Sequence, residues 1–322
     1  MTGFKGARGA GVKPVIGVDA WIQNEAEREK PHRVLLICRN RAGYGQLCEL
    51  LTRAYIDNKY RGRAEMRREW FEDGAASELL CLSGAMSGDI GAAIAAGNVE
   101  LAGQLAADWA RLFPDAFYIE IQRAGHPGTE SYIRHALDIA GRLGLPVVAT
   151  HPVQFLKRED FKAHEARVCI AQGYVLADKR RPRDFTEEQY LKSQAEMGEL
   201  FADIPEALEN AVEIARRCSL TVQLGKNFLP LFPTPEGMTL DDYLVAEAKA
   251  GLEKRLAQLY PHPDEREKQR PRYEERLKFE TDTIIQMGFP GYFLIVADFI
   301  RWGKRNGVPV GPGRGRALTP EP

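Results

Sequence analysis

The sequence predicts an α/β fold that is followed by a mostly helical segment. Short apolar or alternating runs, which are typical of strands, recur over the first two thirds of the chain, and helical patterns separate them. After a proline-rich stretch at 229–235 the chain becomes charged, with helical patterns only. Alternating strands and helices at this spacing favour a parallel sheet or barrel. We therefore expect a distorted parallel β/α barrel over residues 1–228 and a second, helical domain over 229–322.

The strands of this barrel are predicted from short runs of apolar residues. The run 145–150 is apolar up to its last residue, Thr150, which indicates burial on both faces. Residues 117–122 alternate between outward and inward types, as in a strand. The opening residues 3–11 hold too many glycines to form a stable element. The other expected strands are 15–19, 33–38 and 79–83.

The helices of the first domain are predicted from apolar spacing and from their end residues. Apolar residues at spacings of four predict a helix over 44–56. Asn98 is a suitable N-cap for a helix that runs to Phe113. A further helix over 129–143 is expected to end at Gly144, because glycine favours the position after a helix.

The later part of the chain carries clear helix-start signals. Thr186 and Gln189 form a possible capping box for a helix that runs to Phe201. Pro205 suits the first turn of the next helix, which should run to residue 218. Beyond the proline-rich stretch we expect helices over 241–260 and 272–287, joined by a charged linker or loop.

The composition excludes several classes of protein. The formal net charge of −1 gives no overall positive field, so any contact with nucleic acid would need a local patch. The five cysteines are scattered and form no C-x-x-C pair, which indicates buried, reduced thiols. The sequence has neither a signal peptide nor an apolar run of about 20 residues. We therefore expect a soluble, cytoplasmic protein without membrane contact.

The segment 311–315 is the clearest candidate for binding a phosphate group. Gly311, Gly313 and Gly315 carry no side chains, so backbone N–H groups can approach an anion closely. Arg314 adds a forked cation that suits phosphate. A surface turn is the alternative, because the pattern matches neither of the common phosphate-binding loops.

Two residues on or after predicted strands are candidates for chemistry. His151 follows a buried strand, where parallel α/β folds place functional groups, so it could ligate a metal. A buried histidine with satisfied hydrogen bonds is the alternative. Glu120, in the middle of a strand, could ligate a metal or act as a base, or it could simply pair with Arg123.

A compact basic run is the candidate for contact with a macromolecule. Its side chains could touch a DNA backbone or an acidic partner surface, and a solvated loop is the alternative. The run consists of Lys179, Arg180, Arg181 and Arg183.

Segments along nearly the whole chain resemble the bacterial replicative DNA polymerase III alpha subunit family. Residues 288–296 and 307–315 are similar to the start of the polymerase palm of that family. Similar motifs in order over such a length are far more specific than any one of them. The segments that are similar to the family's N-terminal PHP domain (polymerase and histidinol phosphatase type) are 11–17, 41–45, 82–84, 145–150, 201–208 and 227–233.

The resemblance implies template-directed DNA synthesis by the full-length parent, with Mg2+ as cofactor and template-primer DNA and deoxynucleoside triphosphates as partners. It implies that Gly311, Gly313, Arg314 and Gly315 contact the phosphates of the incoming nucleotide. A proofreading exonuclease subunit would dock on the PHP domain. The sliding clamp and the clamp loader would bind regions outside this chain.

The resemblance also implies that the chain is a fragment. The family's first PHP strand, with its H-x-H motif, has no match, and the palm aspartates would lie beyond Pro322. We therefore expect no catalytic residue in this chain. By itself it should be inactive and act as a scaffold of marginal stability.

The PHP metal centre can be compared residue by residue. Asp19 and His32 match ligand positions of the centre. Ala85 stands where the family has a cysteine, and Pro152 and Gln154 stand where it has a D-x-H pair. Alanine and proline cannot ligate a metal, and glutamine is a poor ligand for a transition metal ion. We expect Asp19 and His32 to be remnants that hold no metal.

Two other functions stay open at this point. One is a PHP-type metal-dependent phosphoesterase or exonuclease, which the residues at the missing ligand positions disfavour. The other is a pure docking module for a proofreading exonuclease subunit.

Overall fold

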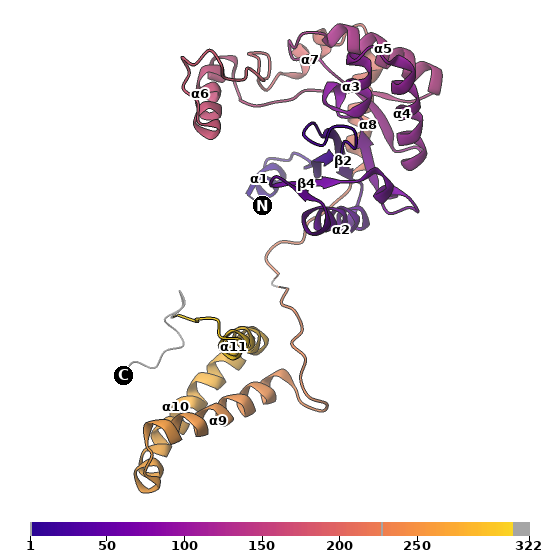
Figure 1. Cartoon of the computed structure of the whole chain (residues 1–322). Coiled ribbons are helices and arrows are strands. Elements are labelled where there is room, and N and C mark those ends of the chain that lie inside the picture. The colour runs from indigo at the N-terminus through magenta and orange to yellow at the C-terminus, as the bar shows by residue number, and fades with distance from the viewer. Residues whose placement is uncertain (1, 227, 312–322) are drawn as a thin grey trace. The chain divides into compact units, whose positions relative to one another are not determined.

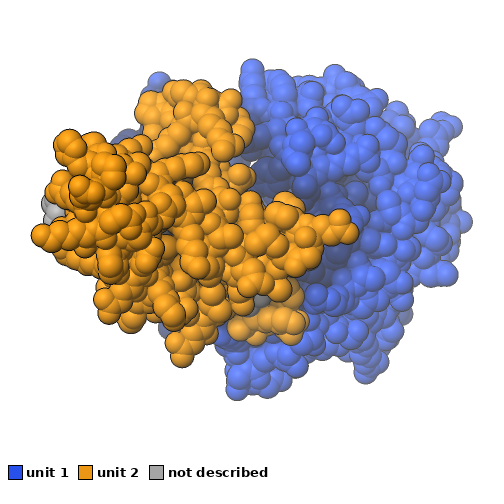
Figure 2. Space-filling view, turned by 90° about the horizontal axis from the view of Figure 1, so that it is seen from below, with its two compact units in different colours: residues 1–222 blue, residues 223–322 orange. Residues whose placement is uncertain are grey.

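The computed structural model describes residues 2–226 and 228–311. The chain divides into two compact units, Met1–Val222 and Gln223–Pro322, which Figure 2 distinguishes by colour. The assignment of residues 1–228 to a PHP domain and of 229–322 to a palm stays a prediction. Each unit is described below by itself.

The first unit is built on a seven-stranded mixed sheet (Figure 1). The strands follow the order β3-β4-β1-β2-β5-β6-β7, so β3 and β7 form the two edges among the described residues. The strands are β1 (Gly17–Ile22), β2 (His32–Cys38), β3 (Lys59–Tyr60), β4 (Arg63–Met66), β5 (Leu79–Leu82), β6 (Phe117–Gln122) and β7 (Val147–Thr150).

The strand pairing corrects the prediction of a distorted parallel β/α barrel. The sheet is mixed rather than parallel, and among the described residues its edge strands β3 and β7 do not pair with each other. The pairs β5–β6 and β6–β7 are parallel, as expected, but β2 pairs antiparallel with both β1 and β5. The loop 23–31 between β1 and β2 contains no helix. Parallel neighbours need a long crossover connection, whereas antiparallel neighbours can be joined by a short loop. The short β1–β2 connection therefore dictates the antiparallel pair.

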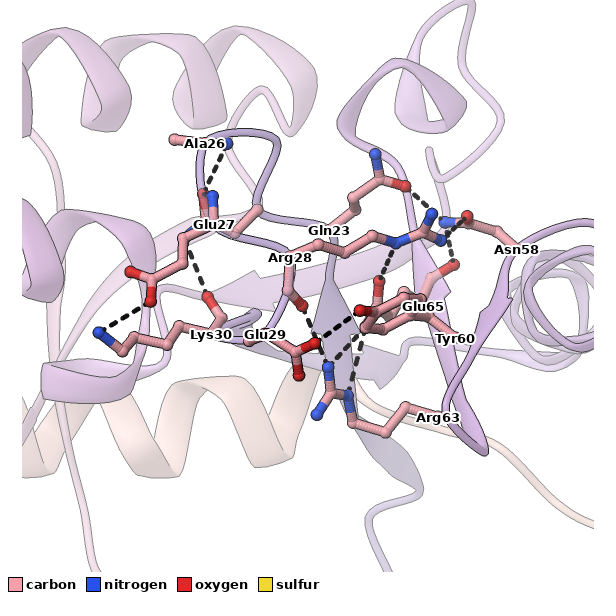
Figure 3. Close-up of polar contacts among 11 residues, drawn as sticks. Gln23, Ala26, Glu27, Arg28, Glu29, Lys30, Asn58, Tyr60, Arg63 and Glu65 are labelled. Carbon is pink, nitrogen blue, oxygen red and sulfur yellow. Dashed lines mark hydrogen bonds and ion pairs between the residues drawn. The ribbon is translucent and has the colours of Figure 1, made fainter.

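A buried carboxylate fixes the β1–β2 loop to the edge of the sheet. Figure 3 shows the side chains of Arg28 and Arg63 converging on Glu65, which is fully buried. Arg28 Nε lies 3.4 Å from one carboxylate oxygen, and Arg63 Nη2 lies 3.2 Å from the other. Asn58 receives a second hydrogen bond from Arg28, at 2.6 Å. A buried carboxylate needs such partners, because an unpaired charge in the interior is costly.

Five helices of the first unit contact strands of the sheet, and several helices begin and end at recognisable residues. The side chains of Asn40 and Asn98 accept hydrogen bonds from Gly43 N and Leu101 N, which caps two of the helices. Gly144 ends another helix in the left-handed conformation, as predicted. The helices are α1 (Thr2–Gly9), α2 (Arg41–Asp57), α3 (Asp89–Ala95), α4 (Val99–Leu112), α5 (Thr129–Leu143), α6 (Phe161–Gln172), α7 (Gln194–Leu200) and α8 (Pro205–Arg217), with short 3-10 turns at Arg68–Phe71, Ala85–Ser87 and Arg158–Asp160. Of these, α2, α3, α4, α5 and α8 contact strands of the sheet.

An aromatic cluster forms the centre of the core beside β6. Trp109 is fully buried, and its ring centroid lies 5.7 Å from Phe71, 6.0 Å from Phe113 and 6.4 Å from Phe117. Each large aromatic side chain removes much apolar surface from water, which is the main stabilising contribution to folding. Four of the five cysteines are buried as well, and only Cys48 is exposed.

Two predictions about element boundaries were wrong. Residues 3–11 were expected to form no element, yet α1 forms there, and Arg8 lies over the ring of Phe4 one helical turn earlier. Gln189 does bond to Thr186 N, but this contact closes a turn rather than a helix. The helix α7 begins later, at a capping box of Ser193 and Glu196.

The second unit contains three described helices, α9 (Leu240–Leu259), α10 (Pro263–Gln286) and α11 (Pro290–Arg305). The predicted linker over 261–272 is largely helix, because α10 begins at Pro263 and continues through Pro271. Arg270 pairs with Glu253 and so joins α10 to α9. No single described helix is long and apolar enough to cross a membrane, and α10 and α11 pass that test only as a pair bent by 118°.

Candidate functional site

A polar cavity of about 780 Å³ opens on one face of the sheet in the first unit. The strands β1, β2, β6 and β7 and the loops that follow β5, β6 and β7 contribute its lining. Functional groups of α/β proteins gather at the carboxyl ends of parallel strands, which is where the β6 and β7 contributions lie. The lining residues whose charges, hydrogen bonds or metal-binding capacity are considered below are Asp19, Arg33, Glu120, Thr150, His151 and Gln154.

The strand register decides which predicted residues can meet. Asp19 is opposite Leu35 in the β1–β2 ladder, and His32 is opposite Ile22. Side chains alternate between the two faces along a strand, and opposite residues share a face. Asp19 therefore projects from the cavity face, whereas His32 projects from the other face with the buried Ile22. The structure does not bring Asp19 and His32 together.

His32 has partners of its own on the far face. Burial lowers its pKa, the nearby Arg68 lowers it further, and the carboxylate of Asp89 partly offsets both effects. Asp89 is buried, pairs with Arg68 and accepts a hydrogen bond of 2.9 Å from the indole of Trp109. This charged cluster is joined to the aromatic core rather than to the cavity.

Asp19 is paired with an arginine that sequence analysis did not single out. Arg33 Nε donates to Asp19 Oδ1 at 2.9 Å, and a second guanidinium nitrogen contacts Oδ2. The same guanidinium lies 4.6 Å from the ring centroid of Trp21, which is directly opposite Arg33 in the ladder. The carboxylate and the ring thus hold the cation at the cavity wall.

Glu120 is the buried carboxyl group of the cavity. Its Oε1 accepts a hydrogen bond of 3.0 Å from Gln122 and another from the Thr150 hydroxyl. Burial raises the pKa of Glu120, the hydrogen bonds from Thr150 and Gln122 oppose this, and the charge of Asp19 adds to the rise. Arg123 is not its partner, contrary to the simplest expectation, because that guanidinium binds Glu130 and Asp203.

His151 anchors the segment around Glu188, which contributes Asp184, Phe185 and Gln189 to the cavity lining. Its Nε2 lies 2.9 Å from the carbonyl oxygen of Glu188, so Nε2 carries the hydrogen, and its Nδ1 is buried with no partner among the described residues. Burial lowers the pKa of His151, which favours the neutral ring. Gln189 donates to the Pro152 carbonyl at 3.2 Å and holds the same segment.

The positions that the resemblance matched to lost ligands all border this cavity. Ala85, Pro152 and Gln154 line it together with Asp19. Within the described residues, no three His, Cys, Asp or Glu side chains are grouped so that they could hold a metal ion. Because Asp19 is already bonded to Arg33, the residues present do not fit a multinuclear metal centre.

The basic run is only partly available to a partner. Arg180 pairs with Asp178 at 2.9 Å, and Arg181 pairs with Glu165 at 2.7 Å. Lys179 and Arg183 are exposed. Two of the four cations are thus already paired, Arg180 within the loop and Arg181 with a carboxylate of α6.

The phosphate-binding candidates can be placed only in part. Gly311 is described, and a Cβ atom added to it would meet no atom of the described residues within 4 Å. Gly313, Arg314 and Gly315 lie outside the described residues.

Comparison with known proteins gives two family matches. Residues 2–124 match the PHP domain, and residues 242–319 match the bacterial DNA polymerase III alpha NTPase domain. Over 314 residues the chain is 54% identical to the DNA polymerase III subunit alpha of Neisseria meningitidis serogroup A. The resemblance to the DNA polymerase III alpha family is confirmed.

Other DNA polymerase III alpha subunits give the same picture. The chain is 51% identical to that of Pseudomonas aeruginosa over 314 residues, and 48% identical to that of Escherichia coli strain K12 over 313 residues. Each match covers 97% of this chain but only 27% of the relative. The chain therefore spans about a quarter of the length of these DNA polymerase III alpha subunits.

Sequence analysis identified three residues that line the cavity but missed Arg33, the arginine of its lining. Glu120 and His151 were singled out because they lie on or after predicted strands, and Asp19 because it matches a ligand position in the family resemblance. Arg33 was missed because its role depends on the antiparallel register that brings it beside Asp19 and Trp21. The available signal was an arginine in a strand-like run with an aspartate and a tryptophan two residues apart in the preceding run.

Proposed function

We propose that this chain forms the PHP part and the beginning of the polymerase part of a DNA polymerase III alpha subunit. The whole subunit would carry out template-directed DNA synthesis with Mg2+ and deoxynucleoside triphosphates on primed DNA in the cytoplasm. Within it, this chain would supply a scaffold, with Gly311, Gly313, Arg314 and Gly315 facing the phosphates of the nucleotide. The single observation that supports this proposal is 54% identity along 97% of the chain.

The residues of the chain itself support a structural rather than a catalytic contribution. The cavity holds an arginine–aspartate pair where PHP enzymes would need metal ligands. The segments of this chain that resemble the polymerase palm do not include the aspartates that bind magnesium in that family. On this proposal the chain contributes structure to the polymerase, and the catalytic carboxylates lie elsewhere in the subunit.

A chimeric polymerase tests the proposal. The matched region of the Escherichia coli alpha subunit is replaced by this chain, and primer extension is measured beside the native subunit, the subunit with that region deleted, and this chain alone. We expect extension by the chimera within about tenfold of the native rate and none by the chain alone. A chimera that folds, as judged by circular dichroism and size, but extends no primer would contradict the proposal.

A second candidate function, docking of a proofreading exonuclease subunit, is favoured by one surface. The segment around α6 exposes apolar side chains, among them Leu156, Ile170 and Val175, of which Ile170 is 83% exposed. Exposed apolar side chains beside the cations Lys179 and Arg183 suit a protein partner. In a pull-down with the cognate exonuclease, Ile170→Asp should lose retention, whereas Leu231→Asp, 91% exposed in the second unit, should keep it. Equal retention of both variants would count against this surface.

A PHP-type metal phosphoesterase is the disfavoured alternative. It would need ligands at positions that hold Ala85, Pro152 and Gln154. Metal analysis of the purified protein tests this alternative. Zinc or manganese at a stoichiometric amount would support a PHP-type phosphoesterase.

A further inference from the structure

The cavity has an acidic wall whose charge is reduced by a single cation of the described lining, Arg33. Three carboxyl groups border it, those of Asp19, Glu120 and Asp184. Arg33 is the one lysine or arginine in the described lining. The balance of formal charges is therefore negative, and Arg33 is the residue that reduces it.

The geometry holds this cation in place from two sides. Arg33 contacts both oxygens of Asp19, and its guanidinium lies over the ring of Trp21 at 4.6 Å. A forked contact to a carboxylate and stacking on an aromatic ring both restrict the side chain. Asp19 and Arg33 share the cavity face of the β1–β2 ladder, so the pair is built into the register of the sheet.

We propose that Arg33 is a built-in counter-ion of the cavity, which takes up the negative charge of Asp19 and thereby keeps divalent metal ions out. A guanidinium beside a carboxylate repels a second cation and uses the oxygen lone pairs that a metal would need. The cavity face is then charge-balanced at Asp19 without a metal ion. This inference rests on the cavity alone and does not depend on the polymerase proposal.

The test measures Mn2+ binding to the full chain by electron paramagnetic resonance, with Arg33→Met as the main variant. Removing the positive charge of Arg33 frees the carboxylate of Asp19, which would receive the metal ion. The Mn2+ affinity should therefore rise by about tenfold or more at low ionic strength. The double variant Asp19→Asn/Arg33→Met should lose this gain, because the carboxylate that would receive the metal is gone. Arg61→Met removes an exposed arginine that pairs with Glu29 away from the cavity, and it should bind Mn2+ as weakly as the native chain does.

Two further variants keep the inference falsifiable if Arg33→Met folds poorly. Arg33→Gln is also neutral but can still donate a hydrogen bond to Asp19, and it should show the same gain in Mn2+ binding. Arg33→Lys keeps the charge and should exclude Mn2+ like the native chain. Unchanged Mn2+ affinity in folded Arg33→Met or Arg33→Gln protein would overturn the inference, and so would a gain that persists in the double variant.

Discussion

Arg123 and Asp203 form a bidentate ion pair across 80 residues of sequence, with nitrogen–oxygen distances of 2.6 and 2.9 Å. The same guanidinium donates to Glu130 at 3.0 Å and to the carbonyl oxygen of Leu200 at 2.7 Å. The Arg123 side chain is only 14% exposed. One residue at the end of β6 thus ties α5 to the turn that precedes α8.

Loss of this arginine should therefore weaken the first unit. We expect Arg123→Ala to lower the free energy of unfolding by about 1–3 kcal/mol, because several charge-assisted hydrogen bonds disappear together. Arg123→Lys should recover only part of the loss, since an ammonium group cannot reproduce the fork. Urea unfolding followed by circular dichroism measures both, with the exposed Arg134→Ala on α5 as control. A loss of the same size in the control would refute the special role of Arg123.

Two glycines of α2 should respond in opposite ways to the same substitution. A Cβ atom on Gly43 would lie 2.2 Å from the carbonyl oxygen of Glu78, whereas one on Gly45 would meet nothing within 4 Å. We expect Gly43→Ala to destabilise the protein by about 1–3 kcal/mol through overpacking. Gly45→Ala should stabilise it by about 0.5–1 kcal/mol, because alanine loses less backbone entropy in a helix. Thermal unfolding of the two variants side by side gives the answer, and shifts of the same sign would contradict the model of close packing at Gly43.

The buried Glu120 should make stability depend on pH. Burial raises its pKa in the folded protein above the value of an unfolded chain. For a group with a raised folded pKa, stability is fully present below the unfolded pKa, near 4.3, and is lost as the pH rises through the folded pKa. Glu120→Gln should remove this part of the pH dependence. Unfolding midpoints in urea between pH 4 and pH 8 test it, and a native and a variant profile that run parallel would exclude the effect.

Trp109 should be sensitive even to a conservative change. Its ring is fully buried and its indole N–H donates to Asp89 at 2.9 Å. Trp109→Phe leaves a cavity and a buried carboxylate with one donor fewer, so we expect a loss of about 2–4 kcal/mol. Trp302→Phe is the matched control, because that side chain is 63% exposed and should change stability by less than about 0.5 kcal/mol. Comparable losses for both tryptophans would show that the core contact is not the cause.

Local patterns predicted the elements well where one signal dominated. The strand Phe117–Gln122 and the helix Thr129–Leu143 have the predicted bounds, since an alternating run marks the first and a terminal glycine marks the end of the second. The helix α10 was missed over its first half because Pro271 and a charged sequence suggested a loop. A proline removes one helical hydrogen bond. Arg270 pairs with Glu267 and Glu274 within α10, and these contacts link the turns on either side of Pro271.

Long-range geometry could not be predicted from local patterns. Asp19 and His32 are close in sequence and looked like members of one site, yet the strand alternation sends them to opposite faces. The Asp19–Arg33 pair needs the antiparallel register, which the alternation of elements did not reveal. Single candidate residues can thus be predicted from local sequence. Which of them contact one another depends on the order and register of the strands.

The unequal exposure of the five thiols offers a handle for labelling the protein. Cys48 on α2 is exposed, while burial raises the pKa of Cys38 to about 11 and also raises that of Cys81 and Cys218. Only a thiolate attacks a maleimide quickly, so the buried thiols should react far more slowly than Cys48. A single fluorophore can therefore be attached without engineering, and a burst of extra modification on heating would report directly that the first unit has opened.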